Sequence, residues 1–234
     1  MLKVAFVMGQ YPEQEFKRRA DVALSYASEE VHIGIFSTQG TAYVPGNTPA
    51  FLDSASSGFV EVFREVERQG YDAAVPLGVL DLGVDAGRCA VDIPIIAPAE
   101  AMLHLACIFG HRFGIVMYHE SRFPLVHRIV ERYGMLDRVA GWRSSGFEGP
   151  DIAANSDAMV QNFVAESRSL IEQDRADVII SFGITQCPVH IKPAWLSAQL
   201  GVPVMEGIGA PLRLAAMAAH LGLRHSRKYW PKIG

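Results

Sequence analysis

The chain has 234 residues, half of them hydrophobic, and a formal net charge of -4 at pH 7. This length allows one large core or two smaller ones. The slightly acidic balance and the absence of any long run of Lys and Arg argue against nucleic acids and membrane surfaces as partners.

Neither the first residues nor the cysteines suggest export or a metal. The apolar run at residues 4–8 is too short for a signal peptide, and nowhere do roughly 18 apolar residues follow one another, so we expect a cytoplasmic protein. Cys89, Cys107 and Cys187 lack CxxC or CxxH spacing, which predicts neither disulfides nor a zinc site. Because nucleotide-binding glycine motifs are also missing, we predict no cofactor and no metal.

Short apolar runs alternate with helical stretches along the chain, which predicts an α/β fold with parallel sheets and helices on both faces. Strands are expected at 3–8, 31–36, 73–77, 93–97, 113–118, 177–182 and 202–205, with a weaker one at 140–144. Helices are expected at 13–28, 58–69, 98–109, 121–133, 152–173, 193–200 and 210–221. Residues 39–57, rich in Pro, Gly and Ser, predict a long loop that is either a lid or a passive surface segment.

The sequence contains an internal two-fold repeat. Its matching pairs, at nearly constant spacing, are residues 4–8 with 113–117, 71–78 with 176–183, and 93–96 with 202–205. We therefore expect two pseudo-symmetric lobes, each with a parallel four-stranded sheet flanked by helices. The lobes would comprise residues 1–110 with 206–234, and residues 111–205.

The repeat also indicates where a ligand would bind. In open α/β sheets, ligands bind beyond the carboxyl ends of the strands. Two lobes that face each other would bring the loops at Gly78 and Gly183 to a shared cleft, where we place the active site for a small-molecule substrate.

Two segments carry a family resemblance. Residues 71–81 with 91–94, and residues 176–185 with 200–204, resemble the catalytic segments of hydantoin racemases in the aspartate/glutamate/hydantoin racemase superfamily. Such enzymes place one cysteine at the end of each strand, because racemisation removes a proton from one face of a carbon and returns one to the other. Here the first position is Gly78 and the second is Gly183 or Ile184, none of which can carry a proton. The resemblance also implies a homo-oligomer.

Four side chains are candidates for the missing proton transfers. Asp81 stands where the resemblance puts an acidic residue, although it could equally cap the helix that follows. Cys187 would resemble the single thiol of arylmalonate decarboxylase if its pKa were lowered. His190 lies in a Pro-rich loop, and His119 follows a strand; each is a possible acid/base group or an inert surface histidine.

Other residues are candidates for substrate binding. By resemblance, Thr185 and the backbone N–H groups of residues 183 to 185 would bind a substrate carboxylate. Tyr118 could hold an oxyanion, and Glu206 would either face the cleft or cap the final helix. The remaining candidates are Gln10, Gly78, Val79, Gly183 and Ile184.

With both thiol positions substituted, the sequence favours cleavage over two-thiol racemisation. The leading hypothesis is a cofactor-independent enzyme that cleaves a small carboxylate or a hydantoin-like ring by hydrolysis, desulfurisation, decarboxylation or elimination. The alternative is a racemase or epimerase with non-cysteine acid/base groups. A second alternative is a ligand-binding protein that has lost its chemistry, which would bind saturably without turnover.

Overall fold

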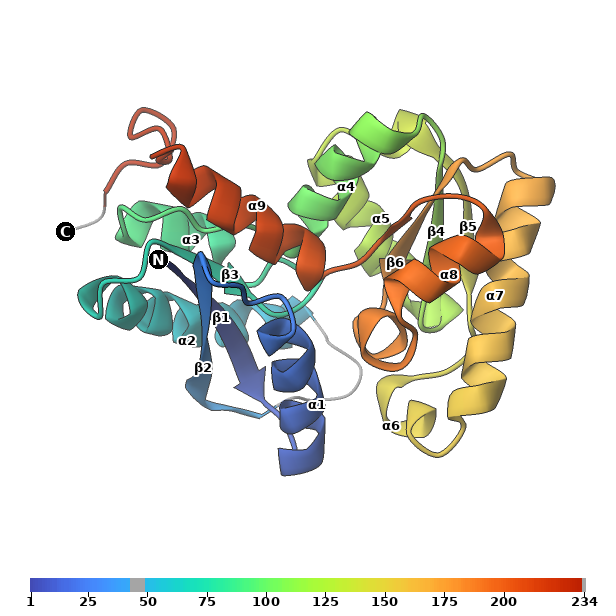
Figure 1. The fold of residues 1–234 in the computed structure, drawn as a ribbon, viewed down its shortest axis with the longest axis horizontal. Helices are drawn as coiled ribbons and strands as arrows, with labels where there is room; N and C mark the ends of the chain where they lie inside the picture. Colours follow the sequence, from blue (N-terminus) through green and yellow to red (C-terminus); the bar gives the residue numbers. More distant parts are fainter. Residues whose placement is uncertain (43–48, 233–234) are drawn as a thin grey trace. The chain divides into compact units, whose positions relative to one another are not determined.

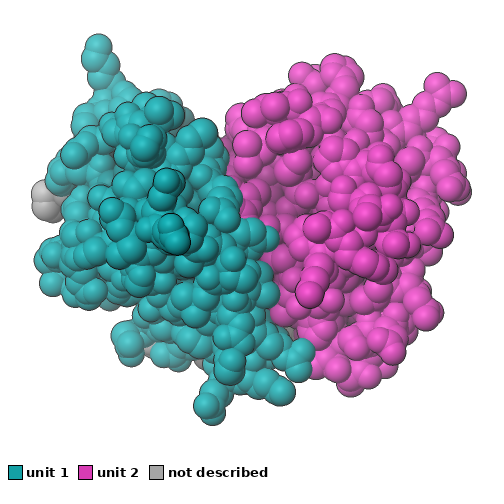
Figure 2. Space-filling model, viewed as in Figure 1, with its two compact units in different colours: residues 1–98, 211–234 teal, residues 99–210 magenta. Residues whose placement is uncertain are grey.

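The computed structural model describes residues 1–42 and 49–232, and it confirms the α/β fold. The chain divides into two compact units, coloured separately in Figure 2. Unit 1 comprises residues 1–98 and 211–234, and unit 2 comprises residues 99–210. Residues 99–110 and 206–210, which we placed in the first lobe from the sequence, group with unit 2.

Unit 1 is built on a parallel sheet with the strand order β2-β1-β3 (Figure 1). Its strands are β1 (Leu2–Gln10), β2 (Val31–Ala42) and β3 (Ala73–Pro76). Its helices are α1 (Glu13–Leu24), α2 (Pro49–Arg68), α3 (Val84–Ala90) and most of α9 (Gly209–His220). Residues 4–8 of the central strand are fully buried, as expected for a strand covered on both faces.

The predicted four-stranded sheet of the first lobe has three strands among the described residues, so that part of the prediction is wrong. The segment at 93–97 forms only an isolated bridge between Ala74 and Ile95. The Ala74 N–H donates to the Pro94 carbonyl at 2.9 Å, and the Ile96 N–H donates to the Ala74 carbonyl at 2.9 Å. The segment pairs with β3 at one residue, whereas the equivalent β7 pairs with β6 at two, so only a bridge results.

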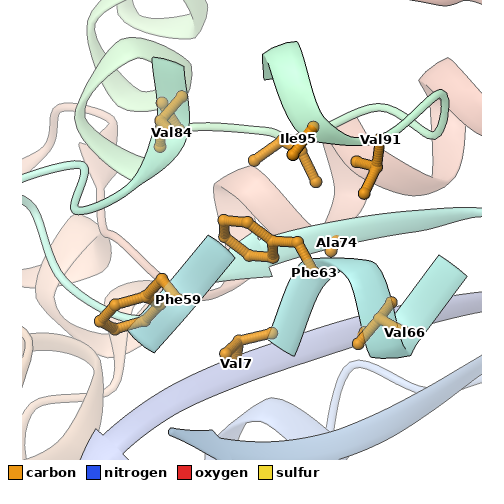
Figure 3. Close-up of a cluster of buried hydrophobic side chains, with 11 residues drawn as sticks. Val7, Phe59, Phe63, Val66, Ala74, Val84, Val91 and Ile95 are labelled. Carbon is orange, nitrogen blue, oxygen red and sulfur yellow. The ribbon is translucent and has the colours of Figure 1, made fainter. Parts of the chain in front are cut away.

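The core of unit 1 lies between α2, α3 and one face of the sheet. Ala5 and Val7 share this face, since alternate residues of a strand point the same way. Figure 3 shows how α2 side chains meet the sheet and the 91–95 segment; the labelled ones are Val7, Phe59, Phe63, Val66, Ala74, Val84, Val91 and Ile95. At Gly87 of α3 a β-carbon would lie 2.6 Å from the Phe63 ring, so glycine there permits the close packing of α3 on α2.

The prediction of a long loop at residues 39–57 is wrong at both ends of that segment. Strand β2 continues to Ala42 and helix α2 begins at Pro49, while residues 43–48 lie outside the described part of the chain. Ala55 and Phe59 are both buried and lie four residues apart, so they extend the apolar face of α2 toward its start. This helical period outweighs the turn-forming composition of the segment.

The segment after α9 is fastened to unit 1 by polar contacts. The Nε2 atom of His225 accepts a hydrogen bond from the Ile95 N–H at 2.8 Å. The Arg227 guanidinium donates to the carbonyls of Arg88 and Val91 and forms an ion pair with Asp92 at 2.7 Å. We call these contacts the C-terminal clamp.

Unit 2 repeats the plan of unit 1 with the strand order β5-β4-β6-β7 (Figure 1). Its strands are β4 (Phe113–Met117), β5 (Val139–Ser144), β6 (Val178–Phe182) and β7 (Val204–Met205). The helices are α4 (Pro98–Phe109), α5 (Phe123–Arg132), α6 (Gly149–Ile152), α7 (Ser156–Glu172) and α8 (Pro193–Leu200). The Ile179 N–H donates to the Pro203 carbonyl at 3.0 Å, which matches the contact between Ala74 and Pro94 and supports the repeat.

A second core fills the space between the unit 2 sheet and helices α6, α7 and α8. Val116 and Ile179 supply the sheet side, and Met159 and Phe163 supply the α7 side. Cys187 is also a member of this cluster. Of the described helices, none is long and apolar enough to cross a membrane.

Candidate active site

Four strands of unit 2 end at the same edge of their sheet, because all of them are parallel. The residues that follow β4, β5, β6 and β7 are Tyr118, Ser145, Gly183 and Glu206. Such an edge is where ligands bind in open α/β sheets. Three of these four positions carry residues that we singled out from the sequence, and Ser145 is an addition.

Tyr118 and Thr185 are in direct contact. The backbone N–H of Thr185 donates to the Tyr118 hydroxyl oxygen at 2.8 Å, and the Thr185 side chain is buried. We expected this N–H to bind a substrate carboxylate, but the phenol oxygen already takes its hydrogen bond. In this structure the Thr185 amide orients the Tyr118 hydroxyl beyond the end of β4, and its expected bond to a substrate carboxylate stays a prediction.

At Gly183, which the resemblance offers together with Ile184 as the second cysteine position, a neighbouring side chain fills the space. A β-carbon built on Gly183 would lie 2.4 Å from Oε1 of Gln186 and 3.1 Å from Cε1 of Tyr118. Real β-carbons do not approach other atoms as closely as 2.4 Å. The glycine is thus matched to Gln186, a residue that we did not predict to belong to the site.

Gln186 is itself held by a buried network. Its Nε2 donates to the Ser145 hydroxyl, which in turn donates to the Tyr118 carbonyl at 3.2 Å. The Phe147 N–H donates to the same hydroxyl oxygen at 3.4 Å. The carboxyl ends of β4, β5 and β6 are therefore connected through side chains.

Cys187 packs in the core of unit 2. Its side chain is fully buried, and its N–H donates to the Gly183 carbonyl at 3.0 Å. Burial, together with the negative charge of Glu206, raises the pKa of the Cys187 thiol well above its usual range. A nucleophilic thiol needs the opposite shift, so the structure favours a neutral packing residue at this position.

Glu206 caps helix α9. Its carboxylate oxygens accept hydrogen bonds from the N–H groups of Ile208 and Gly209, both at 2.7 Å. These are donors that the first turn of a helix leaves without an intrahelical acceptor. Of the two roles that we considered for Glu206, the structure supports the cap.

The two histidine candidates differ in setting. His119 caps the short 3-10 turn Glu120–Arg122, since its Nδ1 accepts from the Ser121 N–H at 3.2 Å. His190 is half-buried and ends the irregular helical segment Thr185–His190, whose first residues are buried beside Gly183. Of the two, His190 lies on the segment that continues from the site.

In unit 1 the turn after β3 carries the first cysteine position and Asp81. Gly78 has a φ of +118°, and no described atom lies within 4 Å of where its β-carbon would be. The Asp81 N–H donates to the Gly78 carbonyl at 3.2 Å, which closes the turn around the buried Val79. The two strand ends therefore differ, because the space at Gly78 is open and the space at Gly183 is filled.

Asp81 is buried, with 5% of its surface exposed, and has a left-handed φ of +53°. The N-cap residue of helix α3 is Gly83, two positions beyond Asp81. Gln10, in contrast, is exposed at the end of β1, where it pairs with Ala42 of β2. In the described ranges 1–42 and 49–232, no three His, Cys, Asp or Glu residues gather as a metal site.

Comparisons with known proteins agree on a family. The model of the Asp/Glu/Hydantoin racemase family matches residues 30–215. A hydantoin racemase from Pseudomonas sp. (strain NS671) is 28% identical over 196 residues, which cover 81% of this chain and 78% of that protein. The hydantoin racemase from Paenarthrobacter aurescens is 25% identical over 192 residues, with 81% and 79% covered.

Solved structures show the same fold. Allantoin racemase from Pseudomonas fluorescens superposes with a TM-score of 0.86 at 22% identity, covering 99% of this chain and 97% of that chain. Arylmalonate decarboxylase superposes with a TM-score of 0.65 at 16% identity, covering 97% and 96%.

Proposed function

The chain belongs to the Asp/Glu/hydantoin racemase family, and from this premise we propose that it racemises or epimerises a small hydantoin-like ring. The proposal is supported by relatives that are named hydantoin racemases over four fifths of the chain. It replaces cleavage, which the substituted thiol positions alone had favoured. Structural likeness to a decarboxylase at 16% identity supports a shared fold and no particular reaction.

The reaction needs a base on one face of the acidic ring carbon and an acid on the other. Gly78 and Gly183 can supply neither, so other side chains must carry the protons. In unit 1 we assign the base to Asp81. The observation that carries this assignment is a buried carboxylate in a left-handed turn three residues beyond Gly78, at the carboxyl end of β3.

In unit 2 we assign the second proton carrier to His190. Cys187 is fully enclosed in the apolar core, whereas His190 is half-buried at the end of the same helical segment. An imidazole exchanges protons readily near neutral pH. In this proposal Asp81 and His190 exchange protons with the same ring carbon.

Proton exchange in deuterated water tests the proposal. An enantiopure 5-substituted L-hydantoin should lose its C5–H signal and its optical rotation faster with the protein than in buffer, without a new product. A new product without C5–H exchange would establish cleavage instead. Saturable binding with neither exchange nor product would show a binding protein that has lost its chemistry.

A further inference from the structure

The side-chain oxygen of Gln186 lacks a hydrogen-bond partner among the described residues. The whole side chain is buried, and Nε2 is paired with the Ser145 hydroxyl, but Oε1 is not paired. Buried polar atoms are nearly always hydrogen-bonded, so each exception needs an explanation. A bound ligand would supply the missing donor.

The hydrogen bonds around Ser145 favour one orientation of the amide. In the structure the Ser145 hydroxyl donates to the Tyr118 carbonyl and its oxygen accepts from Nε2 of Gln186. If the amide were turned by 180°, the hydroxyl would have to donate to Gln186 and would lose its bond to the Tyr118 carbonyl. Oε1 therefore points away from Ser145 and toward Gly183.

Oε1 points toward Gly183, where we propose that the substrate binds. It lies 2.4 Å from where a β-carbon on Gly183 would stand, and Gly183 is one of the two positions, with Ile184, at which the family resemblance places the second cysteine. With Gly183 as that position, the substituted site has lost an acid/base group and gained a hydrogen-bond acceptor at nearly the same point. A neutral amide oxygen cannot carry a proton at neutral pH, but it can orient a donor on the ligand.

We propose that Gln186 is a specificity-determining residue whose Oε1 accepts a hydrogen bond from a ring N–H of the substrate. The substrate class is then a ring that carries an N–H, such as a cyclic ureide, imide or lactam. A malonate-type dicarboxylate is excluded, because its oxygens would face another acceptor. This inference rests on the proposed function for the location of the substrate at Gly183.

The test measures binding of three probes by titration calorimetry: 5-benzylhydantoin and its N1-methyl and N3-methyl derivatives. The variant Gln186→Met keeps the length of the side chain but removes the acceptor, and Gln161→Met on the exposed face of α7 is the matched control. We expect Gln186→Met to weaken binding of 5-benzylhydantoin by about tenfold or more. For one of the two N-methyl derivatives, the variant and the wild type should bind alike.

Methylated probes keep the test informative if Gln186→Met folds poorly. The wild type should then bind one N-methyl derivative at least about tenfold more weakly than 5-benzylhydantoin, and phenylmalonate not at all. Equal affinity of wild type and Gln186→Met for 5-benzylhydantoin would overturn the inference, as would equal loss of affinity for all three probes.

Exchange of C5–H, followed in the same wild-type samples, separates this inference from the proposed function. Binding that depends on Gln186 without exchange would leave the inference standing and refute the isomerase. Exchange with no dependence on Gln186 would do the reverse. No binding of any N–H probe to the wild type would refute both.

Discussion

At Gly183 the β-carbon of any other residue would collide with Gln186 Oε1, so a cysteine cannot simply be restored there. We expect Gly183→Cys to destabilise the protein by roughly 1–3 kcal/mol, as overpacking does. Gln186→Ala should relieve the collision, so the double variant should be less destabilised than the sum of the two single variants. Urea denaturation of the four proteins measures this coupling.

The control for that experiment is Gly78→Ala. Its cost should be of similar size, roughly 1–2 kcal/mol, but should arise from the backbone, because φ is +118° and the surrounding space is open. The loss of stability in Gly78→Ala should therefore simply add to that in Gln186→Ala, with no coupling energy between the two. Coupling at Gly78 as strong as at Gly183 would contradict the steric explanation.

The role of Asp81 in catalysis can be tested with a substitution that should leave the stability of the protein nearly unchanged. Asparagine has nearly the same shape and, like aspartate, tolerates a left-handed φ, so Asp81→Asn should fold normally. If Asp81 is the base, C5–H exchange should fall by about 100-fold or more. The matched control is Asp85→Asn, at an exposed position in α3. Unchanged exchange in Asp81→Asn would remove the carboxylate from the mechanism.

Cys187 should make the stability depend on alkaline pH. Because its pKa is raised in the folded protein, the neutral thiol contributes stability below the ordinary thiol pKa. That contribution should be lost as the pH rises above about 8.5, where the unfolded chain ionises. Cys187→Ala should flatten this alkaline decline in urea denaturation, whereas Cys107→Ala should not. If the stability of Cys187→Ala declined as steeply at alkaline pH as that of the wild type, the decline would not come from the Cys187 thiol.

Residue roles were the hardest part of the site to predict from the sequence. Gly78, Asp81 and Gly183 stand out because they follow predicted strands, and the structure puts each of them at a strand end. Gln186 was missed because its part in the site depends on one helical turn that folds its side chain back on Gly183. The available signal was a long polar residue three positions after a strand-ending glycine.

At the scale of elements, the sequence repeat anticipated the sheets well. Residues equivalent by the repeat, such as Pro94 and Pro203, accept matching backbone hydrogen bonds in the two units. The failures occurred where strand pairing is short or where the composition suggested a loop. The 93–97 segment forms a bridge and no strand, and residues 49–57 are helical despite their loop-like composition.

The C-terminal clamp should stabilise unit 1. Arg227 donates to three backbone carbonyls and to Asp92, which a lysine cannot do with the same planar geometry. We expect Arg227→Ala to lower the free energy of unfolding by roughly 1–3 kcal/mol. Arg227→Lys should retain only a minor part of the stability that Arg227 contributes. Arg224→Ala, at an exposed position nearby, should have little effect on the free energy of unfolding. Circular dichroism during urea denaturation measures these changes.

At the scale of the whole molecule, unit 2 is a continuous segment with its own sheet and core. We therefore expect a fragment of residues 99–210 to fold alone, since a domain needs its own hydrophobic core to do so. Dispersed amide signals in an NMR spectrum would show this. A fragment that stays unfolded would mean that unit 2 depends on unit 1. The expected homo-oligomer remains a prediction that sedimentation of the full chain can test.

Unit 1, in contrast, is assembled from two stretches of chain that lie on either side of unit 2 in the sequence. On the ribosome, His225 and Arg227 emerge only after all of unit 2 has been made. Unit 2 can therefore fold while the protein is still being synthesised, but the contacts of the clamp with Ile95 and Asp92 cannot form until residues 225 and 227 have been added to the chain. Unit 1 is thus completed after unit 2, although its first strand is made earlier.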